Sequence, residues 1–244
     1  MMKILVTGIS GRMGQAVKQA VELNDGTELG STHDVGQDIA AAMSAADCAI
    51  DFSFHGFTPE LLATAVAQGK PLVIGTTGHT DEERAAITKA AKQIPIVFAS
   101  NYSVGVNTLF WLTRKATQIL KDYDIEIIEM HHHHKLDAPS GTARTLAEVV
   151  CEETGMDYNK DVMHGREGLV GARPQRQIGM HSMRGGDVVG DHTVMYATDG
   201  ERVELTHKAS SRMTFAGGAV RAALWLADKP AGLYNMQDVL GFTN

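Results

Sequence analysis

The sequence is poor in cysteine and has no long apolar run. Its two cysteines, Cys48 and Cys151, lie far apart and form no CxxC motif, so we expect neither a disulfide framework nor a cysteine-based metal site. No segment approaches the roughly 20 consecutive apolar residues of a membrane span. The N-terminus lacks the apolar region and cleavage site of a secretory signal. We therefore expect a cytoplasmic protein with no membrane association.

Positive charge is also scarce. The 244 residues include 22 Lys and Arg against 29 Asp and Glu, which gives a formal net charge of −7. Proteins that bind nucleic acid carry a basic balance or patch, so this composition argues against a nucleic-acid partner. The content of 43% hydrophobic and 21% charged residues is typical of a globular protein, and the length predicts one or two domains.

Over the first hundred residues, short apolar runs alternate with segments of helical periodicity. Thr58-Pro59-Glu60 has the pattern of a helix start, and Thr80-Asp81-Glu82-Glu83 has the form of a capping box. Strands and helices that alternate in this way predict a parallel sheet with helices on its faces. The expected strands lie at residues 2–7, 27–34, 48–53, 71–76 and 94–99.

The rest of the chain has a different pattern. Ile125–Met130 is an expected strand, and Ser140 is suited to cap a helix that Gly155 ends. Asp199-Gly200 separates two alternating runs and predicts a hairpin, so this region looks antiparallel. A strongly apolar helix is expected over Ala216–Asp228. Further strands are expected at residues 178–183, 192–198 and 202–208.

A glycine-rich segment follows the first expected strand and opens the first helix. Gly8, Gly11 and Gly14 have the spacing GxxGxxG, and Asp34 follows 20 residues later at the end of the second strand. Glycines at this place let a pyrophosphate approach the helix N-terminus, and an acid there can bind the ribose of NAD. A plain glycine-rich turn is the alternative, but the combined context favours dinucleotide binding.

A second small-residue segment, Gly75-Thr76-Thr77-Gly78, follows the fourth expected strand. Ligands of parallel sheets bind at the edge where the strands end, and small residues there let a flat ring lie against the backbone. A simple turn explains this tetrapeptide about equally well.

The most unusual feature is a run of four histidines, His131–His134, followed by Lys135. The run is internal and short, which argues against an affinity tag. Neighbouring residues of an extended chain point to opposite faces, so the four imidazoles cannot converge on one metal ion. Imidazoles near neutrality, a lysine and the helix start at Ser140-Gly141-Thr142 instead suit a proton-donating site for a carboxylate substrate. An exposed polar loop is the alternative.

Together these segments resemble the 4-hydroxy-tetrahydrodipicolinate reductase (dihydrodipicolinate reductase) family. The resemblance implies NAD(P)H-dependent reduction of a cyclic dicarboxylate, 4-hydroxy-tetrahydrodipicolinate, with loss of water, in diaminopimelate and lysine biosynthesis. The matching segments occur in the same order as in the family and together span almost the whole chain. The matching segments are Gly8–Gly14, Gly75–Gly78, Ser100–Asn107, Glu129–Thr142, Arg184–Asp187, Gly190–His192, Glu204–His207 and Arg212–Phe215.

The resemblance also implies roles for individual residues. His131 and Lys135 correspond to the family's acid–base histidine and proton-donating lysine, and His132, Ser140, Gly141 and Thr142 to residues that bind substrate. No role is implied for His133 or His134, and no metal is expected. The cofactor site corresponds to Gly8, Ile9, Ser10, Gly11, Arg12, Met13, Asp34, Gly75, Thr76, Thr77, Ala99, Ser100, Asn101 and Tyr102.

The same resemblance predicts an α/β architecture with two domains. Residues 1–102 and 216–244 are expected to form a Rossmann-like parallel-sheet domain that binds the dinucleotide. Residues 103–215 are expected to form an α+β domain whose mixed sheet binds substrate and assembles a homo-oligomer, as a tetramer.

The choice between NADH and NADPH depends on the residue after Asp34. Relatives that accept NADPH often have arginine there, and this sequence has Val35, which removes a partner for the 2′-phosphate and favours NADH. Arg12 could still reach the 2′-phosphate, which keeps NADPH open as the cofactor. The connection from Asp34 to Cys48 is also shorter than is usual in the family, so the family's contacts with the adenosine end of the cofactor are not carried over to this sequence.

Two alternatives remain for the function. Another nicotinamide enzyme with the same fold would act on a different dicarboxylate or imine, and the segment 131–142 argues against it. A regulator that senses the dinucleotide without catalysis would need a basic recognition helix, and none is apparent.

Overall fold

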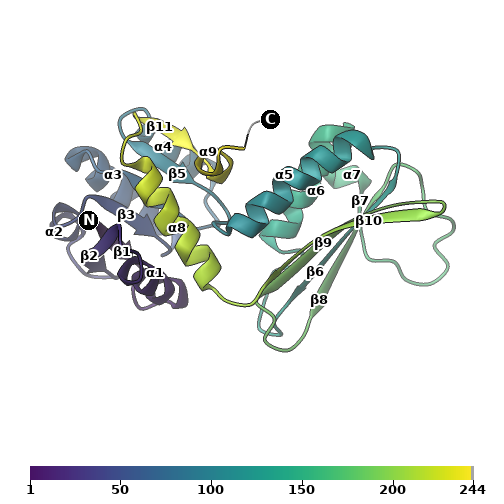
Figure 1. The fold of residues 1–244 in the computed structure, drawn as a ribbon, viewed down its shortest axis with the longest axis horizontal. Coiled ribbons are helices and arrows are strands. Elements are labelled where there is room, and N and C mark those ends of the chain that lie inside the picture. The colour runs from purple at the N-terminus through teal and green to yellow at the C-terminus, as the bar shows by residue number, and fades with distance from the viewer. Residues whose placement is uncertain (243–244) are drawn as a thin grey trace. The chain divides into compact units, whose positions relative to one another are not determined.

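The structure, a computed structural model, describes residues 1–242 and contains two compact units (Figure 1). The first unit comprises Met1–Val104 and the chain from Arg212, and the second comprises Gly105–Ser211. No helix within residues 1–242 is both long enough and apolar enough to cross a bilayer.

The first unit contains a six-stranded parallel sheet with the order β11-β5-β4-β3-β1-β2. The Rossmann-like parallel sheet predicted from the sequence is therefore confirmed. Its edge strand β11, which follows the helix at Met213–Leu226, was not expected from the sequence pattern. The strands are β1 (Met2–Thr7), β2 (Thr27–His33), β3 (Cys48–Asp51), β4 (Leu72–Ile74), β5 (Pro95–Phe98) and β11 (Gly232–Tyr234).

Helices cover both faces of this sheet because successive strand residues point to opposite sides. Ile4 and Val6 of β1 pack with α1 (Arg12–Glu22), α8 (Met213–Leu226) and α9 (Met236–Leu240). Leu5 packs on the other side. The helices on that side are α2 (Ile39–Ser44), α3 (Thr58–Gln68), which follows a 3-10 turn at His55–Phe57, and α4 (Asp81–Ala90).

Two local predictions for this unit are confirmed, and the ends of several strands differ. Thr80 and Glu83 form the predicted capping box at the start of α4. Pro59 lies in the first turn of α3, as expected. The strands β2 and β3 end at His33 and Asp51, short of the predicted ends. The residues that follow them therefore lie in loops at the carboxyl edge of the sheet, where ligands of parallel sheets bind.

The second unit contains a five-stranded mixed sheet with the order β10-β9-β6-β8-β7. The predicted hairpin at Asp199-Gly200 is present, and Gly200 has φ +92°. The antiparallel pattern read from the residues alone is incomplete, because β6 pairs in parallel with β8. The strands are β6 (Asp124–His131), β7 (Val162–His164), β8 (Ile178–Arg184), β9 (Gly190–Thr198) and β10 (Glu201–Ala209).

One face of the mixed sheet packs against helices. The core on this face joins Ile127 of β6 and Tyr196 of β9 to α5 (Val104–Ile119) and α6 (Gly141–Thr154). Ser140 caps α6 and Gly155 ends it with φ 67°, as predicted. A short helix, α7 (Tyr158–Asp161), follows. The helix-covered face also carries the alternate residues at the end of β6, which are Glu129 and His131.

Candidate active site

Two positions at the junction of β1 and α1 have room only for glycine, one in the loop and one in the first turn of α1. Gly8 has φ +64°, and a Cβ there would lie 2.6 Å from the carbonyl oxygen of Phe52. A Cβ at Gly14 would lie 2.1 Å from the carbonyl oxygen of Gly8. The amide of Gly11 donates to that same oxygen at 3.0 Å. The loop is therefore compact and presents backbone at the N-terminus of α1, where an anionic group is stabilised.

Asp34 lies directly after β2 and faces this loop. Its carboxylate accepts hydrogen bonds from the amides of Ser10 at 2.8 Å and Val35 at 2.9 Å. The hydrogen bonds from Ser10 lower the pKa of Asp34 below its ordinary value. Asp34 is thus an ionised acceptor fixed beside the glycine-rich loop, as a ribose-binding residue must be.

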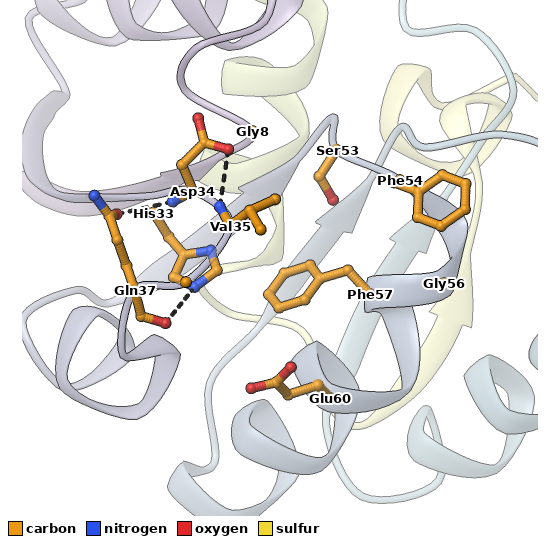
Figure 2. A pocket seen from close by; sticks show the side chains of 11 residues that line it. Gly8, His33, Asp34, Val35, Gln37, Ser53, Phe54, Gly56, Phe57 and Glu60 are labelled. Carbon is orange, nitrogen blue, oxygen red and sulfur yellow. Dashed lines mark hydrogen bonds between the residues drawn. The ribbon is translucent and has the colours of Figure 1, made fainter.

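A cavity of ≈ 500 Å³ lies beside Asp34 (Figure 2). The rings of His33 and Phe57 stack with centroids 4.9 Å apart and form part of its wall. Glu60 contributes a second acidic side chain, and no Lys or Arg lines the cavity within the described residues. The cavity therefore combines an apolar surface suited to a flat ring with negative charge. It is lined by Gly8, His33, Asp34, Val35, Gly36, Gln37, Ser53, Phe54, Gly56, Phe57 and Glu60.

The turn after β4 is tied to a buried carboxylate. Asp51 is 1% exposed and accepts hydrogen bonds from the hydroxyls of Thr7 and Ser53, each at 2.5 Å, and of Thr76 at 2.6 Å. These bonds join the carboxyl ends of β1, β3 and β4. The Thr76 hydroxyl is thereby used within the protein, so Thr76 can offer a ligand its backbone but not a free hydroxyl.

The segment 99–102 shows a similar division of roles. The Tyr102 side chain is buried, and its hydroxyl donates to the carbonyl oxygens of Ile74 and Val97, both at 2.9 Å. Burial raises the pKa of Tyr102 well above its ordinary value. The Tyr102 side chain therefore serves the core, while Ala99 and Asn101 are half-buried and Ser100 is exposed.

The other predicted cofactor residues of this unit lie at the same edge of the sheet. Ser10, Gly11, Arg12 and Thr77 are exposed. Ile9 and Met13 are half-buried and pack against the core. Gly75 lies against Phe52, because a Cβ there would come within 2.3 Å of that ring. The first unit therefore brings the predicted dinucleotide residues into one region.

The second candidate region centres on a fully buried carboxylate, Glu129, at the end of β6. Arg184 of the neighbouring strand β8 donates two hydrogen bonds to Glu129, both at 2.9 Å. Nδ1 of His131 lies 2.5 Å from Oε2 of Glu129, and the Ser140 amide donates to Oε1 at 3.2 Å. This bidentate arrangement with arginine is among the stronger charge-assisted contacts in proteins.

The ionisation state of Glu129 determines which ring nitrogen of His131 is available to a ligand. Burial by itself raises the pKa of Glu129, but the hydrogen bonds from His131, Arg184 and Ser182 outweigh it and lower the pKa to about 2. An ionised carboxylate accepts from Nδ1–H of His131, so that nitrogen carries a proton. Nε2 is then the ring nitrogen left for a ligand. A Cβ at Gly190 would lie 3.0 Å from this atom, so glycine there keeps the space open.

Lys135 lies in the loop that follows the histidine run. Its Nζ is 2.9 Å from Oδ1 of Asp137, and its side chain is 20% exposed. Arg184 donates to the carbonyl oxygen of Asp137 at 2.7 Å, which ties this loop to β8. The loop therefore joins Lys135 to the same arginine that holds Glu129.

The four histidines have different environments. His131 is buried and His132 is half-buried. The His132 amide donates to the carbonyl oxygen of Val188 at 2.8 Å, which fixes its backbone. His133 and His134 are exposed, with ring centroids 3.9 Å apart. No group of three or more His, Cys, Asp or Glu within residues 1–242 is arranged to hold a metal ion.

The Ser140 side chain makes its hydrogen bonds within the protein and does not point to a substrate. It is 2% exposed. Its hydroxyl accepts from the Ala143 amide at 3.2 Å and is hydrogen-bonded to Nε2 of His192 at 3.0 Å. Ser140 therefore fixes the start of α6, while Gly141 is exposed and Thr142 half-buried at the positive end of that helix.

Three residues of this site have no role in the sequence-based prediction: Glu129, Arg184 and His192. The alternation along β6 does place Glu129 on the apolar face, two residues before His131, and a carboxylate on such a face is a usable signal. The bond between Glu129 and Arg184 joins residues 55 positions apart and follows from the pairing of β6 with β8.

Comparison with known proteins identifies the family. The model of the dihydrodipicolinate reductase N-terminus matches residues 2–102, and that of the C-terminus matches residues 105–240. The chain is 68% identical over 244 residues to the 4-hydroxy-tetrahydrodipicolinate reductase of Akkermansia muciniphila, covering 100% of this chain and 99% of the relative. It is 49% identical over 263 residues to that of Cupriavidus metallidurans, covering 98% and 99%.

A solved structure agrees with this result. A dipicolinate-bound dihydrodipicolinate reductase from Paenisporosarcina sp. TG-14 superimposes with a TM-score of 0.78 at 25% sequence identity, covering 98% of each chain. The chain therefore belongs to the 4-hydroxy-tetrahydrodipicolinate reductase family.

Proposed function

We propose that the protein reduces 4-hydroxy-tetrahydrodipicolinate to tetrahydrodipicolinate, with loss of water, in the diaminopimelate and lysine pathway. The observation that carries this proposal is the arrangement of Glu129, His131 and Lys135 beside the N-terminus of α6, in a chain of this family. That arrangement provides proton donors and a positive environment, which a dicarboxylate substrate requires.

The residues of the first unit fit a nicotinamide dinucleotide. The glycine-rich loop has no room for a Cβ at Gly8 or Gly14, and Asp34 is held ionised beside it. These features match a bound pyrophosphate and ribose. When bound, the nicotinamide supplies the hydride. The residues proposed to hold the cofactor are Gly8, Ile9, Ser10, Gly11, Arg12, Met13, Asp34, Gly75, Thr76, Thr77, Ala99, Ser100, Asn101 and Tyr102.

The residues of the second unit bind the charged substrate and donate or accept protons. Reduction of a conjugated imine leaves negative charge on the substrate, which a proton must neutralise. Lys135 holds a proton at Nζ, and His131 presents Nε2 for acid–base work because Glu129 holds Nδ1. Gly141 and Thr142 offer the positive end of α6 to one carboxylate, Ser140 fixes that end, and His132 contacts the substrate.

We further propose a homotetramer in the cytoplasm that prefers NADH and needs no metal. The mixed sheet supports assembly, because the face opposite α5 and α6 carries Ile128, Met130 and Met195 between charged residues. Such a face suits pairing with a second copy of the chain.

The preference for NADH leads to a prediction about Val35, which is 97% exposed and lines the cavity beside Asp34. Replacing Val35 with arginine should raise the ratio of kcat/KM for NADPH to that for NADH by about tenfold, because arginine adds a partner for the 2′-phosphate. Steady-state kinetics with both cofactors measure the ratio. Val35→Gln adds bulk without charge and should leave the ratio near its original value. An unchanged ratio in Val35→Arg would place recognition elsewhere, first at Arg12.

The reaction itself is tested with enzymatically generated substrate. The purified protein should consume NADH, and the double variant His131→Ala, Lys135→Ala should consume it no faster than the background. Equal rates for the wild type and the double variant would contradict the proposed activity.

Prolonged treatment with EDTA should leave the rate unchanged, and a rate lost to EDTA and restored by a divalent cation would contradict the expectation of no metal.

A further inference from the structure

A buried histidine on β9, His192, lies between His131 and the start of α6. It is 3% exposed and pairs across the sheet with Glu129. Its Nε2 is hydrogen-bonded to Oγ of Ser140 at 3.0 Å, and its ring meets that of His131 at 74° with centroids 5.2 Å apart. One side chain therefore touches both the proposed acid–base residue and the residue that begins α6.

The surroundings of His192 keep its ring uncharged. Nδ1 is buried and has no hydrogen-bond partner in the part of the chain that the structure describes, so a proton there would be unsatisfied. Burial and the nearby His131 lower the pKa of His192 to about 3. The titratable groups around it are Glu129 and His131 on β6, Lys135 in the following loop and His207 on β10.

Ser140 connects His192 to the helix start. The Ser140 hydroxyl accepts from the Ala143 amide at 3.2 Å, and the Ser140 amide donates to Glu129 at 3.2 Å. Ser140 thus ties the first turn of α6 to β6, and the bond to His192 ties it to β9. The placement of Gly141 and Thr142 relative to His131 depends on both attachments, because a helix end can bind a carboxylate only where its amides point.

We propose that His192 is a positioning residue that acts through Ser140 to hold the N-terminus of α6 where it binds a substrate carboxylate. It supplies neither charge nor proton to the reaction. This role rests on the proposed function, in which that helix end receives the carboxylate. A residue that only fills the core would change the folded fraction, whereas a positioning residue changes affinity in the folded enzyme.

The first test compares His192→Phe, which keeps a ring without nitrogen, with His192→Gln, whose amide can still hydrogen-bond to Ser140. In His192→Phe, the KM for substrate and the calorimetric Kd for dipicolinate should both rise by about tenfold, the worth of one hydrogen bond. The Kd for NADH should not change. His192→Gln should recover most of the affinity. Unchanged KM and Kd in folded His192→Phe would overturn the proposal.

A double-mutant cycle with Ser140→Ala tests the route of the effect. If His192 acts through Ser140, His192→Phe should weaken dipicolinate binding by less than about twofold in the Ser140→Ala background. Full additivity of the two substitutions would overturn the proposal. Failure of the wild type to turn over substrate would contradict the proposed function instead, and calorimetry on dipicolinate would still test the positioning role.

Acid unfolding tests the uncharged state of the ring. His192 takes up a proton at its ordinary pKa of 6.5 when unfolded but only near 3 when folded. The folded state should therefore lose stability as the pH falls below 6.5. Between pH 6.5 and about 3, the unfolding constant of the wild type divided by that of His192→Phe should rise by up to about tenfold for each unit by which the pH falls. A ratio that does not change with pH would overturn the uncharged role.

Discussion

Replacing Lys135 with alanine should lower kcat by about 10²- to 10⁴-fold, the usual contribution of a positioned acid or base. The change removes a fixed positive charge and a proton donor that Asp137 holds at 2.9 Å. The affinity for NADH should change little, because the residues proposed to hold the dinucleotide belong to the first unit. Steady-state kinetics give kcat, and fluorescence titration gives the Kd for NADH.

Lys121→Ala provides the matched control for this variant. Lys121 is an exposed lysine of the same unit, in the turn after α5. Its loss should leave both kcat and the Kd for NADH near the wild-type values, which separates a specific role of Lys135 from a general effect of charge. A Lys135→Ala variant with wild-type kcat would remove Lys135 from the mechanism.

Replacing Glu129 with glutamine should have a large effect on both stability and activity. Arg184 and His131 would lose their buried anionic partner, and breaking a buried pair in this way costs about 3–5 kcal/mol. The amide would also no longer hold Nδ1–H of His131 with a charge-assisted bond, so kcat should fall even in the folded fraction. Urea unfolding measures the first effect, and kinetics on the folded protein measure the second.

The pH dependence of the loss in Glu129→Gln carries a definite sign. Hydrogen bonds lower the pKa of Glu129 from 4.5 to about 2, so its contribution is complete above 4.5 and disappears as the pH falls towards 2. The stability difference between the wild type and Glu129→Gln should therefore shrink over that range. A difference that stays constant would show that the cost arises from packing rather than from the carboxylate charge.

Glu153→Gln is the control for this second prediction. Glu153 of α6 accepts hydrogen bonds from Arg114 and from Gln118, as an ion-paired carboxylate away from the candidate site. Because the pair is near the surface, its loss should cost no more than about 1 kcal/mol and leave kcat unchanged. A similar drop of kcat in both variants would attribute the effect of Glu129 to general destabilisation.

Local patterns in the sequence predicted much of the fold. The capping box at Thr80 and Glu83, the cap at Ser140 and the hairpin at Asp199-Gly200 depend on residues within a few positions of one another. The helix α2 and the edge strand β11 were not predicted. They are short, and their apolar residues gain a partner only when the sheet has formed.

The histidine run shows where local reasoning stops. Its motif context predicted His131 and Lys135 as candidate residues, and alternation in an extended chain argued that four imidazoles could not share one ion. The structure gives a different reason for their separation, because β6 ends at His131 and the chain then enters a turn that leaves His133 and His134 exposed.

By itself, the sequence determined the alternation of strands and helices, the glycines that the dinucleotide loop requires, and the motifs that indicate the family. The tertiary structure decided which partners act on the candidate residues. Arg184 reaches Glu129 only because β8 lies beside β6, and His192 reaches Ser140 only because β9 lies on the other side. Such contacts join residues far apart in the chain, and no local pattern specifies the order of strands in a sheet.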